Sequence, residues 1–268
     1  MNNYDKYMHG VHDAEQKRLE IMAKMLGGAN FLPPIVKDMR IIEFGSGTGA
    51  ILREVAQMAP NVEAIGIDRE AAQISTAKQL AAEQGLTNIR FIESDIMNLE
   101  WKEALCDAAY CRYVLEHVPD PILVVKKMSQ TIRPGGWVCA YEWINSASTI
   151  FPACPTAAKV WSGIYQYQNS IGGCSAIADR LADIFIKAGF NDHEITAHPW
   201  VCTAKDKERL SWYVSGAIEI IDQTSKEILR KNFTTQDAIN KAKEEYNAVL
   251  EHPGALLVEV MCRAIGRV

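Results

Sequence analysis

The stretch M-R-I-I-E-F-G-S-G-T-G-A, from Met39 to Ala50, decides the fold of this chain. Its first half, over 39–44, is a short apolar run rich in β-branched residues, which is typical of a buried strand. Three glycines follow at alternating positions, and a helix-like stretch then runs to Met58, just before Pro60. A strand that passes through glycines into a helix predicts a ligand site, because glycine lets a ligand approach the backbone closely.

The same alternation of strand and helix continues after this stretch. Further strands are predicted at 62–67, 88–92, 108–113 and 137–142, and helices at 69–84 and 121–132. Strands that alternate with helices at this spacing pair in parallel and are joined by right-handed crossovers. We therefore predict an α/β fold with a Rossmann-like, doubly wound sheet.

The two ends of the chain are less regular. A helix with one apolar face is predicted over 11–26, ahead of the first strand. After the fifth strand the sequence predicts an aromatic stretch at 146–174, a helix at 175–188, strands at 193–203 and 256–265, and charged amphipathic helices over 205–250 that are split near Thr234 and Thr235. These helices are expected to cap a ligand site, and the alternative is a plain covering layer or the face of a homodimer.

No low-complexity linker interrupts the chain, so a single domain over 1–268 is expected. Its predicted parts are an N-terminal helical cover at 1–30, a half with alternating strands and helices at 39–142, and a less regular half at 143–268.

Composition narrows the class of protein. The 268 residues are 48% hydrophobic and 23% charged, as in ordinary globular proteins, and no apolar run predicts a membrane span. The net charge of −5 and the scattered basic residues argue against nucleic-acid binding. Seven cysteines without a C-x-x-C pair indicate buried thiols and no metal site, and the N-terminus lacks a secretion signal. We expect a cytoplasmic protein with a small-molecule partner.

Three carboxylates follow or end successive predicted strands. Glu43 precedes the first glycine, Asp68 ends the second strand and Asp95 follows the third. The carboxyl ends of parallel strands meet at one edge of a sheet, so these side chains are expected to lie around one ligand. Together they suit a cofactor with an ammonium group, a ribose and an adenine, but no phosphate. Each also has a local explanation, as a helix-dipole partner, an N-cap or a turn former respectively.

The glycines alone leave a second cofactor open. Gly45, Gly47 and Ala50 satisfy the dinucleotide pattern G-x-G-x-x-A, and Asp68 would serve either nucleotide. A nicotinamide-dependent dehydrogenase is therefore the alternative, although a pyrophosphate is poorly served by the charge of Glu43.

The residues as a set resemble the class I S-adenosylmethionine-dependent methyltransferases, and more specifically a small-molecule subgroup. The likeness is carried by the acidic-x-G-x-G-x-G loop at 43–49, by L-E-H-V-P-D-P at 115–121, by R-P-G-G at 133–136, and by weaker matches at 175–190 and at Y-M-H-G over 7–10. It implies a seven-stranded sheet in the order 3-2-1-4-5-7-6 with strand seven antiparallel. It also implies S-adenosylmethionine as cofactor, S-adenosylhomocysteine as product, and methyl transfer to O, N or C of a small organic acceptor. Residues 39–142 are then expected to form the cofactor-binding half, and residues 143–268 the acceptor-binding half. A non-catalytic cofactor-binding member of the family remains a further alternative.

Site residues follow from the motifs and from this resemblance. The expected cofactor-binding residues are Tyr7, Glu43, Gly45, Ser46, Gly47, Gly49, Asp68, Arg69, Asp95, Ile96, Arg112 and Tyr113. The candidate catalytic residues are His117, Glu142 and His9, either as a general base or to orient the acceptor. The aromatic residues expected to line the acceptor pocket are Trp143, Phe151, Trp161, Tyr165, Tyr167 and Trp200. For the catalysis itself, we expect proximity and orientation to matter most.

Overall fold

The computed structural model describes residues 13–268, so the expected site residues Tyr7 and His9 lie outside the described part of the chain. The strands are β1 (Arg40–Phe44), β2 (Glu63–Asp68), β3 (Ile89–Glu93), β4 (Cys106–Arg112), β5 (Ile132–Trp143), β6 (Thr149–Phe151), β7 (His193–Thr203) and β8 (Leu256–Arg267). The α-helices are α1 (Asp13–Met25), α2 (Ala50–Met58), α3 (Ala71–Glu83), α4 (Pro121–Gln130), α5 (Pro155–Ser170), α6 (Leu181–Ala188), α7 (Lys207–Arg230) and α8 (Gln236–Glu251). Short 3-10 turns are η2 (Leu115–His117), η3 (Asn145–Ala147) and η4 (Ala178–Arg180).

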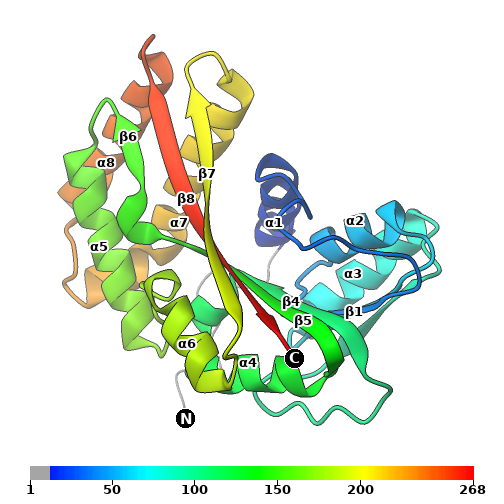
Figure 1. The fold of residues 1–268 in the computed structure, drawn as a ribbon. Coiled ribbons are helices and arrows are strands. Elements are labelled where there is room, and N and C mark those ends of the chain that lie inside the picture. The colour runs from blue at the N-terminus through cyan, green and yellow to red at the C-terminus, as the bar shows by residue number, and fades with distance from the viewer. Residues whose placement is uncertain (1–12) are drawn as a thin grey trace.

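The strands form one sheet in the order β3-β2-β1-β4-β5-β8, and β7 pairs with β8 (Figure 1). β1 to β5 run parallel, whereas β8 is antiparallel to both β5 and β7. The short β6 pairs with the start of β8, beyond the end of β5. β7 and β8 are the predicted sixth and seventh strands, so the expected order is confirmed. The sequence did not predict β6, whose three residues are too few to show a strand pattern.

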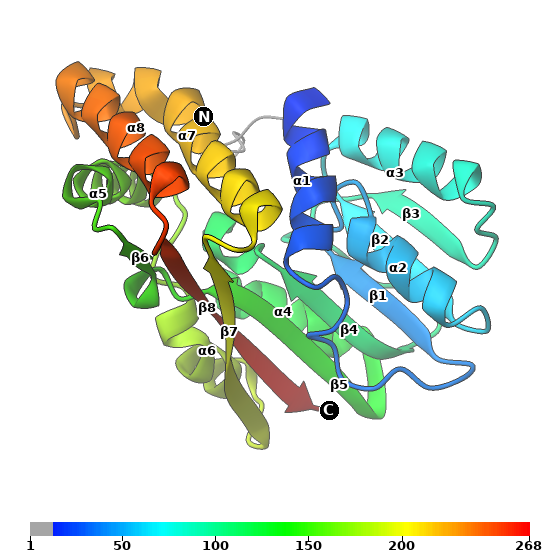
Figure 2. The ribbon, with the colours of Figure 1, turned by 90° about the horizontal axis from the view of Figure 1, so that it is seen from above.

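Helices cover both faces of the sheet (Figures 1 and 2). In β1, Ile41 packs into the core beneath α1, α2 and α3, whereas Ile42 and Phe44 pack into the core beneath α4 and α6. Strands buried on both faces are apolar throughout, which is why the central strands were recognisable from the sequence. α2 and α4 follow the neighbouring strands β1 and β4 on opposite faces. The chain therefore diverges at the carboxyl ends of these strands, where open α/β sheets form their ligand crevice.

Local sequence explains several helix boundaries. The Asp120 carboxylate accepts a hydrogen bond from the Leu123 amide, 2.9 Å away, and Pro121 occupies the first turn of α4. Gly189 ends α6 in a left-handed conformation with a φ of 105°. The Thr235 hydroxyl caps α8, which confirms the expected division of the charged region into two helices.

A group of three helices, α5, α7 and α8, gathers around the start of β8 (Figure 2). The sequence indicated only an aromatic stretch where α5 lies. Gly163 in the middle of α5 lowers the helix propensity. A Cβ at Gly163 would lie 2.9 Å from the Phe233 carbonyl oxygen, so this glycine lets the chain between α7 and α8 pack directly against the helix.

Within residues 13–268, no helix is both long enough and apolar enough to cross a membrane.

Candidate functional site

A cavity of about 510 Å³ lies at the carboxyl ends of β1, β2 and β4 and extends beneath α5, α7 and α8. The loop after β1 supplies one wall of the cavity, and α1 lies across this loop. The Glu20 carboxylate on α1 accepts hydrogen bonds from the Thr48 hydroxyl, 2.5 Å away, and from the Arg53 guanidinium, 2.6 Å away. Helix α1 is therefore anchored to the glycine loop.

The glycine loop turns the chain sharply between β1 and α2. Gly49 has a φ of 75°, and a Cβ on it would lie 2.5 Å from Cζ of Phe91, so only glycine fits there. The Gly47 amide donates to Asp68 Oδ2, 2.8 Å away, which ties the loop to the end of β2. Gly45, Ser46 and Gly47 line the cavity. Gly49 is absent from the lining, so it shapes the loop from behind and does not contact the cavity.

Glu43 and Arg112 line the cavity, and both carry buried polar atoms for which residues 13–268 supply no hydrogen-bond partner. Glu43 is 4% exposed, and its Oε2 finds no hydrogen-bond partner within the described residues. The same holds, within residues 13–268, for Nε and Nη2 of Arg112. Burial raises the pKa of Glu43 to about 8, although the Tyr110 hydroxyl and the Arg112 charge oppose this rise. Because nearly all buried polar groups have partners, this pair indicates a place where a ligand supplies them.

Asp68 and Ile96 also line the cavity, and their roles at the ribose and adenine ends of a nucleoside stay a prediction. Burial raises the pKa of Asp68, and its carboxylate accepts from the amides of Gly47 and Glu70. Arg69 lies beside them in the lining, with its Nε 3.1 Å from Glu70 Oε1.

Asp95 differs from its expected position. Its carboxylate accepts from the Met97 amide at 2.9 Å and from the Asn98 side-chain amide at 2.7 Å, and it is absent from the lining of the cavity. The structure thus shows Asp95 as a turn former. Each carboxylate oxygen has more than one lone pair, so its bond to an adenine amine stays a prediction.

The end of β4 brings Arg112 and Tyr113 to the cavity, as the topology predicted. Tyr113 has a φ of 56°, an uncommon conformation for a residue with a large side chain. Its ring stacks on Trp143 with a centroid separation of 5.2 Å, and the Arg112 guanidinium lies 4.9 Å from the Tyr113 ring centroid. These contacts hold the two side chains at the point where the cavity passes from β4 toward α5.

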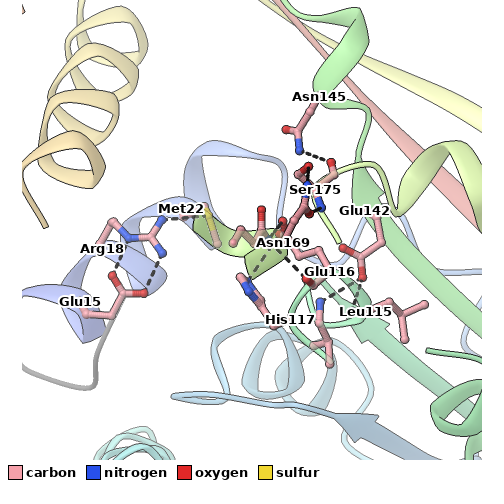
Figure 3. A network of polar contacts seen from close by, with 12 residues as sticks. Glu15, Arg18, Met22, Leu115, Glu116, His117, Glu142, Asn145, Asn169 and Ser175 are labelled. Carbon is pink, nitrogen blue, oxygen red and sulfur yellow. Dashed lines mark hydrogen bonds and ion pairs between the residues drawn. The ribbon is translucent and has the colours of Figure 1, made fainter. Parts of the chain in front are cut away.

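Glu142 was expected to point into the crevice and orient the acceptor. This expectation is wrong, because the side chain does not reach the cavity. The side chain is fully buried and absent from the cavity lining. Its Oε1 accepts from the Val114 amide at 3.0 Å and from the Leu115 amide at 2.8 Å (Figure 3). Burial, and next the Glu116 charge, raise the pKa of Glu142 well above its ordinary value. Glu142 therefore supports the turn that follows Tyr113.

His117, in turn η2, does line the cavity. Its side chain is 19% exposed, and its Nε2 lies 3.6 Å from Glu116 Oε1 (Figure 3). Glu116 also accepts a hydrogen bond from the Gln168 amide of α5, at 2.9 Å. Burial lowers the pKa of His117, and the neighbouring Glu116 charge opposes this. The imidazole is consequently favoured in its neutral form, which can accept a proton.

Residues 143–268 contribute several aromatic side chains to the wall of the cavity. Trp143, Trp161 and Tyr165 line the cavity as expected. The other three aromatic residues expected there do not: Phe151 is 51% exposed, Tyr167 is buried in the core, and Trp200 is buried with its indole N–H donating to the Met25 carbonyl, 3.0 Å away.

The sequence analysis missed many of the other lining residues. Those used below are Trp212, Tyr213, Tyr246 and Glu259. The first three lie on α7 and α8, where nothing distinguishes a cavity-facing aromatic from one that packs in the core. Glu259 did carry a signal, because it interrupts the apolar inward positions of β8 between Leu257 and Met261, all three of which are buried.

Comparison with known proteins agrees with this geometry. A family model described as a methyltransferase domain matches residues 35–188, more than half of the chain. A ubiquinone biosynthesis O-methyltransferase of Paracidovorax citrulli is 33% identical over 133 residues, which are 49% of this chain and 54% of that protein. The sterol 24-C-methyltransferase erg6 of Aspergillus fumigatus is 28% identical over 111 residues, 41% of this chain and 29% of that protein. The matched part therefore spans about half of one relative and less than a third of the other.

Solved structures share the fold. The phosphoethanolamine N-methyltransferase 2 of Haemonchus contortus, in complex with S-adenosylmethionine, superposes with a TM-score of 0.53 at 15% identity, over 92% of this chain and 51% of that one. The geranyl diphosphate C-methyltransferase of Streptomyces coelicolor A3(2) gives 0.52 at 14% identity, over 95% and 79%. With the family match over the glycine loop and the five parallel strands, the resemblance described from the sequence is confirmed: the chain belongs to the methyltransferase-domain family.

Proposed function

We propose that the protein transfers a methyl group from S-adenosylmethionine to O, N or C of a small organic acceptor. The observation that carries this proposal is the pair formed by Glu43 and Arg112, which line the cavity and carry buried polar atoms without hydrogen-bond partners in the described chain. S-adenosylmethionine bears an ammonium and a carboxylate on one carbon. The carboxylate of Glu43 and the guanidinium of Arg112 complement these two groups.

The remaining cofactor residues fit the rest of the same molecule. Asp68 would accept the ribose hydroxyls, and Ile96 would pack on the adenine ring. Ser46 presents another buried oxygen, Oγ, without a partner within residues 13–268. Residues 39–142 thus form the cofactor-binding half, and residues 143–268 form the acceptor-binding half with α7 and α8 as its cap.

The chemistry requires positioning above all. When bound, S-adenosylmethionine supplies an electrophilic methyl group on a sulfonium centre. The protein gains rate by holding the acceptor in line with that methyl group, an effect that contributes about 7 to 11 kcal/mol in well-oriented reactions. For an acceptor with an O–H or N–H group, neutral His117 would take the proton that this group loses on methylation.

The alternatives have less support. A dinucleotide carries no ammonium group to pair with the buried carboxyl of Glu43, and its pyrophosphate would oppose ionisation of that carboxyl. A non-catalytic member of the family would need no proton acceptor at the cavity wall, yet His117 lies there. The relatives named above methylate different atoms according to their names, so the acceptor atom stays undecided between O, N and C.

Isothermal titration with S-adenosylmethionine, S-adenosylhomocysteine and NADH tests the cofactor. The first two should bind in the micromolar range and NADH should not, and the reverse order would overturn the proposal. Incubation with labelled cofactor and a metabolite extract tests catalysis, because an enzyme passes the label to a small molecule and a non-catalytic protein does not.

We also propose that the protein lies in the cytoplasm. All seven cysteines are free thiols, which suits the reducing cytoplasm. Size-exclusion chromatography with light scattering would distinguish a monomer from the homodimer considered above.

A further inference from the structure

The part of the cavity formed by residues 143–268 combines aromatic rings with a single carboxylate. Its aromatic lining residues are Trp143, Trp161, Tyr165, Trp212, Tyr213 and Tyr246. These side chains come from the end of β5 and from α5, α7 and α8, so four separate elements present rings to one space. The carboxylate is Glu259 of β8, which also lines the cavity.

Glu259 is bound only by neutral groups. It is 4% exposed; its Oε1 accepts from the Tyr213 hydroxyl and its Oε2 from the Ser148 hydroxyl, each at 2.5 Å. None of the ion pairs in the described chain includes Glu259. A carboxylate removed from water without a cationic partner is costly, and a ligand that brings a positive charge would offset this cost.

The charge of the lining favours such a ligand. The three arginines of the cavity, Arg18, Arg69 and Arg112, come from α1 and from the ends of β2 and β4. Within the described chain, residues 143–268 add no lysine or arginine to the lining, and Glu259 is their one charged contribution. An anionic acceptor would meet no opposite charge in this part, whereas an ammonium group would meet both a carboxylate and the faces of aromatic rings.

We propose that Glu259, with the surrounding aromatic rings, binds an organic ammonium group on the methyl acceptor. The inference rests on the proposed function and specifies its substrate class: a cationic amine whose hydrocarbon part packs against the apolar lining residues Ile164, Ala217, Ile220 and Leu257. The hydroxyls of Tyr213 and Ser148 orient the carboxylate. Glu259 is thus a specificity residue and takes no part in the transfer itself.

The test uses three probes that share a phenethyl group: 2-phenylethylamine as the cation, 2-phenylethanol as the neutral compound and 3-phenylpropionate as the anion. Each is titrated into the full chain saturated with S-adenosylhomocysteine, near neutral pH. The amine should bind at least about tenfold more tightly than the alcohol, and the anion should bind weakest. Failure of the amine to bind at millimolar concentration, or equal binding of all three, overturns the inference.

Variants identify the residue responsible. Glu259→Gln keeps the size of the side chain and an acceptor oxygen but removes the charge, so amine affinity should fall about tenfold while alcohol affinity stays the same. Glu251→Gln, at the exposed end of α8, removes a charge of the same sign elsewhere and should leave all three affinities unchanged. Equal losses for amine and alcohol in Glu259→Gln would mean that the residue has only a structural role.

The two proposals fail in distinguishable ways. S-adenosylhomocysteine binding in the absence of any amine tests the proposed function alone. If it binds and the probes show no preference for the cation, only the present inference is wrong. If Glu259→Gln also loses S-adenosylhomocysteine binding, Tyr213→Phe provides a milder change, which should reduce the preference for the amine without affecting the cofactor.

Discussion

Replacement of Glu43 by glutamine tests the cofactor site through its pH dependence. Burial raises the pKa of Glu43 to about 8, so the ligand-free protein holds this carboxyl protonated near neutral pH. An ammonium group placed against it favours the carboxylate. Binding of S-adenosylhomocysteine, which carries the same ammonium group, should therefore release a proton from Glu43.

The magnitude follows from two opposing contributions. At about pH 7, ionising a carboxyl with a pKa of about 8 costs roughly 1.4 kcal/mol. A hydrogen bond to a charged group contributes about 1.5 to 3 kcal/mol. The advantage of glutamate over glutamine is then at most about 1.6 kcal/mol near pH 7, or roughly 15-fold in Kd. Near pH 8.5 the ionisation cost is small, and the ratio should approach roughly 150-fold.

Isothermal titration of both proteins at about pH 6.5, 7.5 and 8.5 measures this ratio. The ligand's own amine titrates equally in both experiments, so the ratio of the two Kd values isolates Glu43. Repetition in buffers of different ionisation enthalpy counts the released proton. A ratio that does not change with pH would refute the assigned contact between Glu43 and the ammonium group.

The same shift has a consequence for stability in the absence of ligand. A carboxyl whose pKa is raised in the folded state stabilises that state in its protonated form, fully below its ordinary pKa near 4.5, and this contribution is lost as the pH rises through about 8. The free energy of unfolding of the natural protein, relative to Glu43→Gln, should therefore decrease between these pH values. Denaturation in urea at several pH values measures it, and a constant difference would contradict the assigned pKa.

Three further substitutions test the geometry of the site. Gly49→Ala should lower the free energy of unfolding by about 2 kcal/mol or more, because a φ of 75° is strained for alanine and its Cβ would lie 2.5 Å from Phe91. The control is Gly85→Ala, which measures the backbone strain alone, because Gly85 has a φ of 66° and nothing lies within 4 Å of its Cβ. Equal losses of unfolding free energy in Gly49→Ala and Gly85→Ala, measured by urea denaturation, would disprove the steric argument. Glu142→Ala should lower the free energy of unfolding by about 2 to 5 kcal/mol, because two buried amides lose their acceptor. Glu142→Gln keeps an acceptor oxygen and should lower it less. A Gln variant as unstable as the Ala variant would count against the role of Glu142 as acceptor for these amides. His117→Asn should lower kcat on an identified acceptor by roughly 100-fold or more while the Kd of S-adenosylhomocysteine stays within about twofold, and an unchanged kcat would exclude this histidine from proton transfer.

The sheet and the glycine loop were predictable because their signals are local. The apolar run of β1, the three glycines and α2 occupy fewer than 20 consecutive positions, and each residue type restricts its own backbone. The boundaries of α2 and β7 agree with the predicted ranges for this reason. Helix α5 escaped recognition because Gly163 weakens its local signal while tertiary packing requires that glycine.

Side-chain direction was less predictable than backbone structure. Glu142 and Glu43 each lie near the end of a parallel strand, and the sequence assigned both to the crevice. In the structure Glu43 lines the cavity, whereas Glu142 turns to the amides of Val114 and Leu115. The direction of each side chain depends on which unpaired donors lie within reach of its carboxylate, and those donors come from a different part of the chain.

The sequence by itself determined the fold class and the family to which the chain belongs, and it predicted a candidate site at the loop after β1, because these depend on patterns within short segments. Only the tertiary structure decided which side chains meet in the cavity. Glu259 and Ser148 are more than a hundred positions apart in the chain, and Tyr213 comes from a third element. Their contact exists because α5, α7 and α8 pack around the start of β8, and that packing depends on interactions between segments that no local pattern contains.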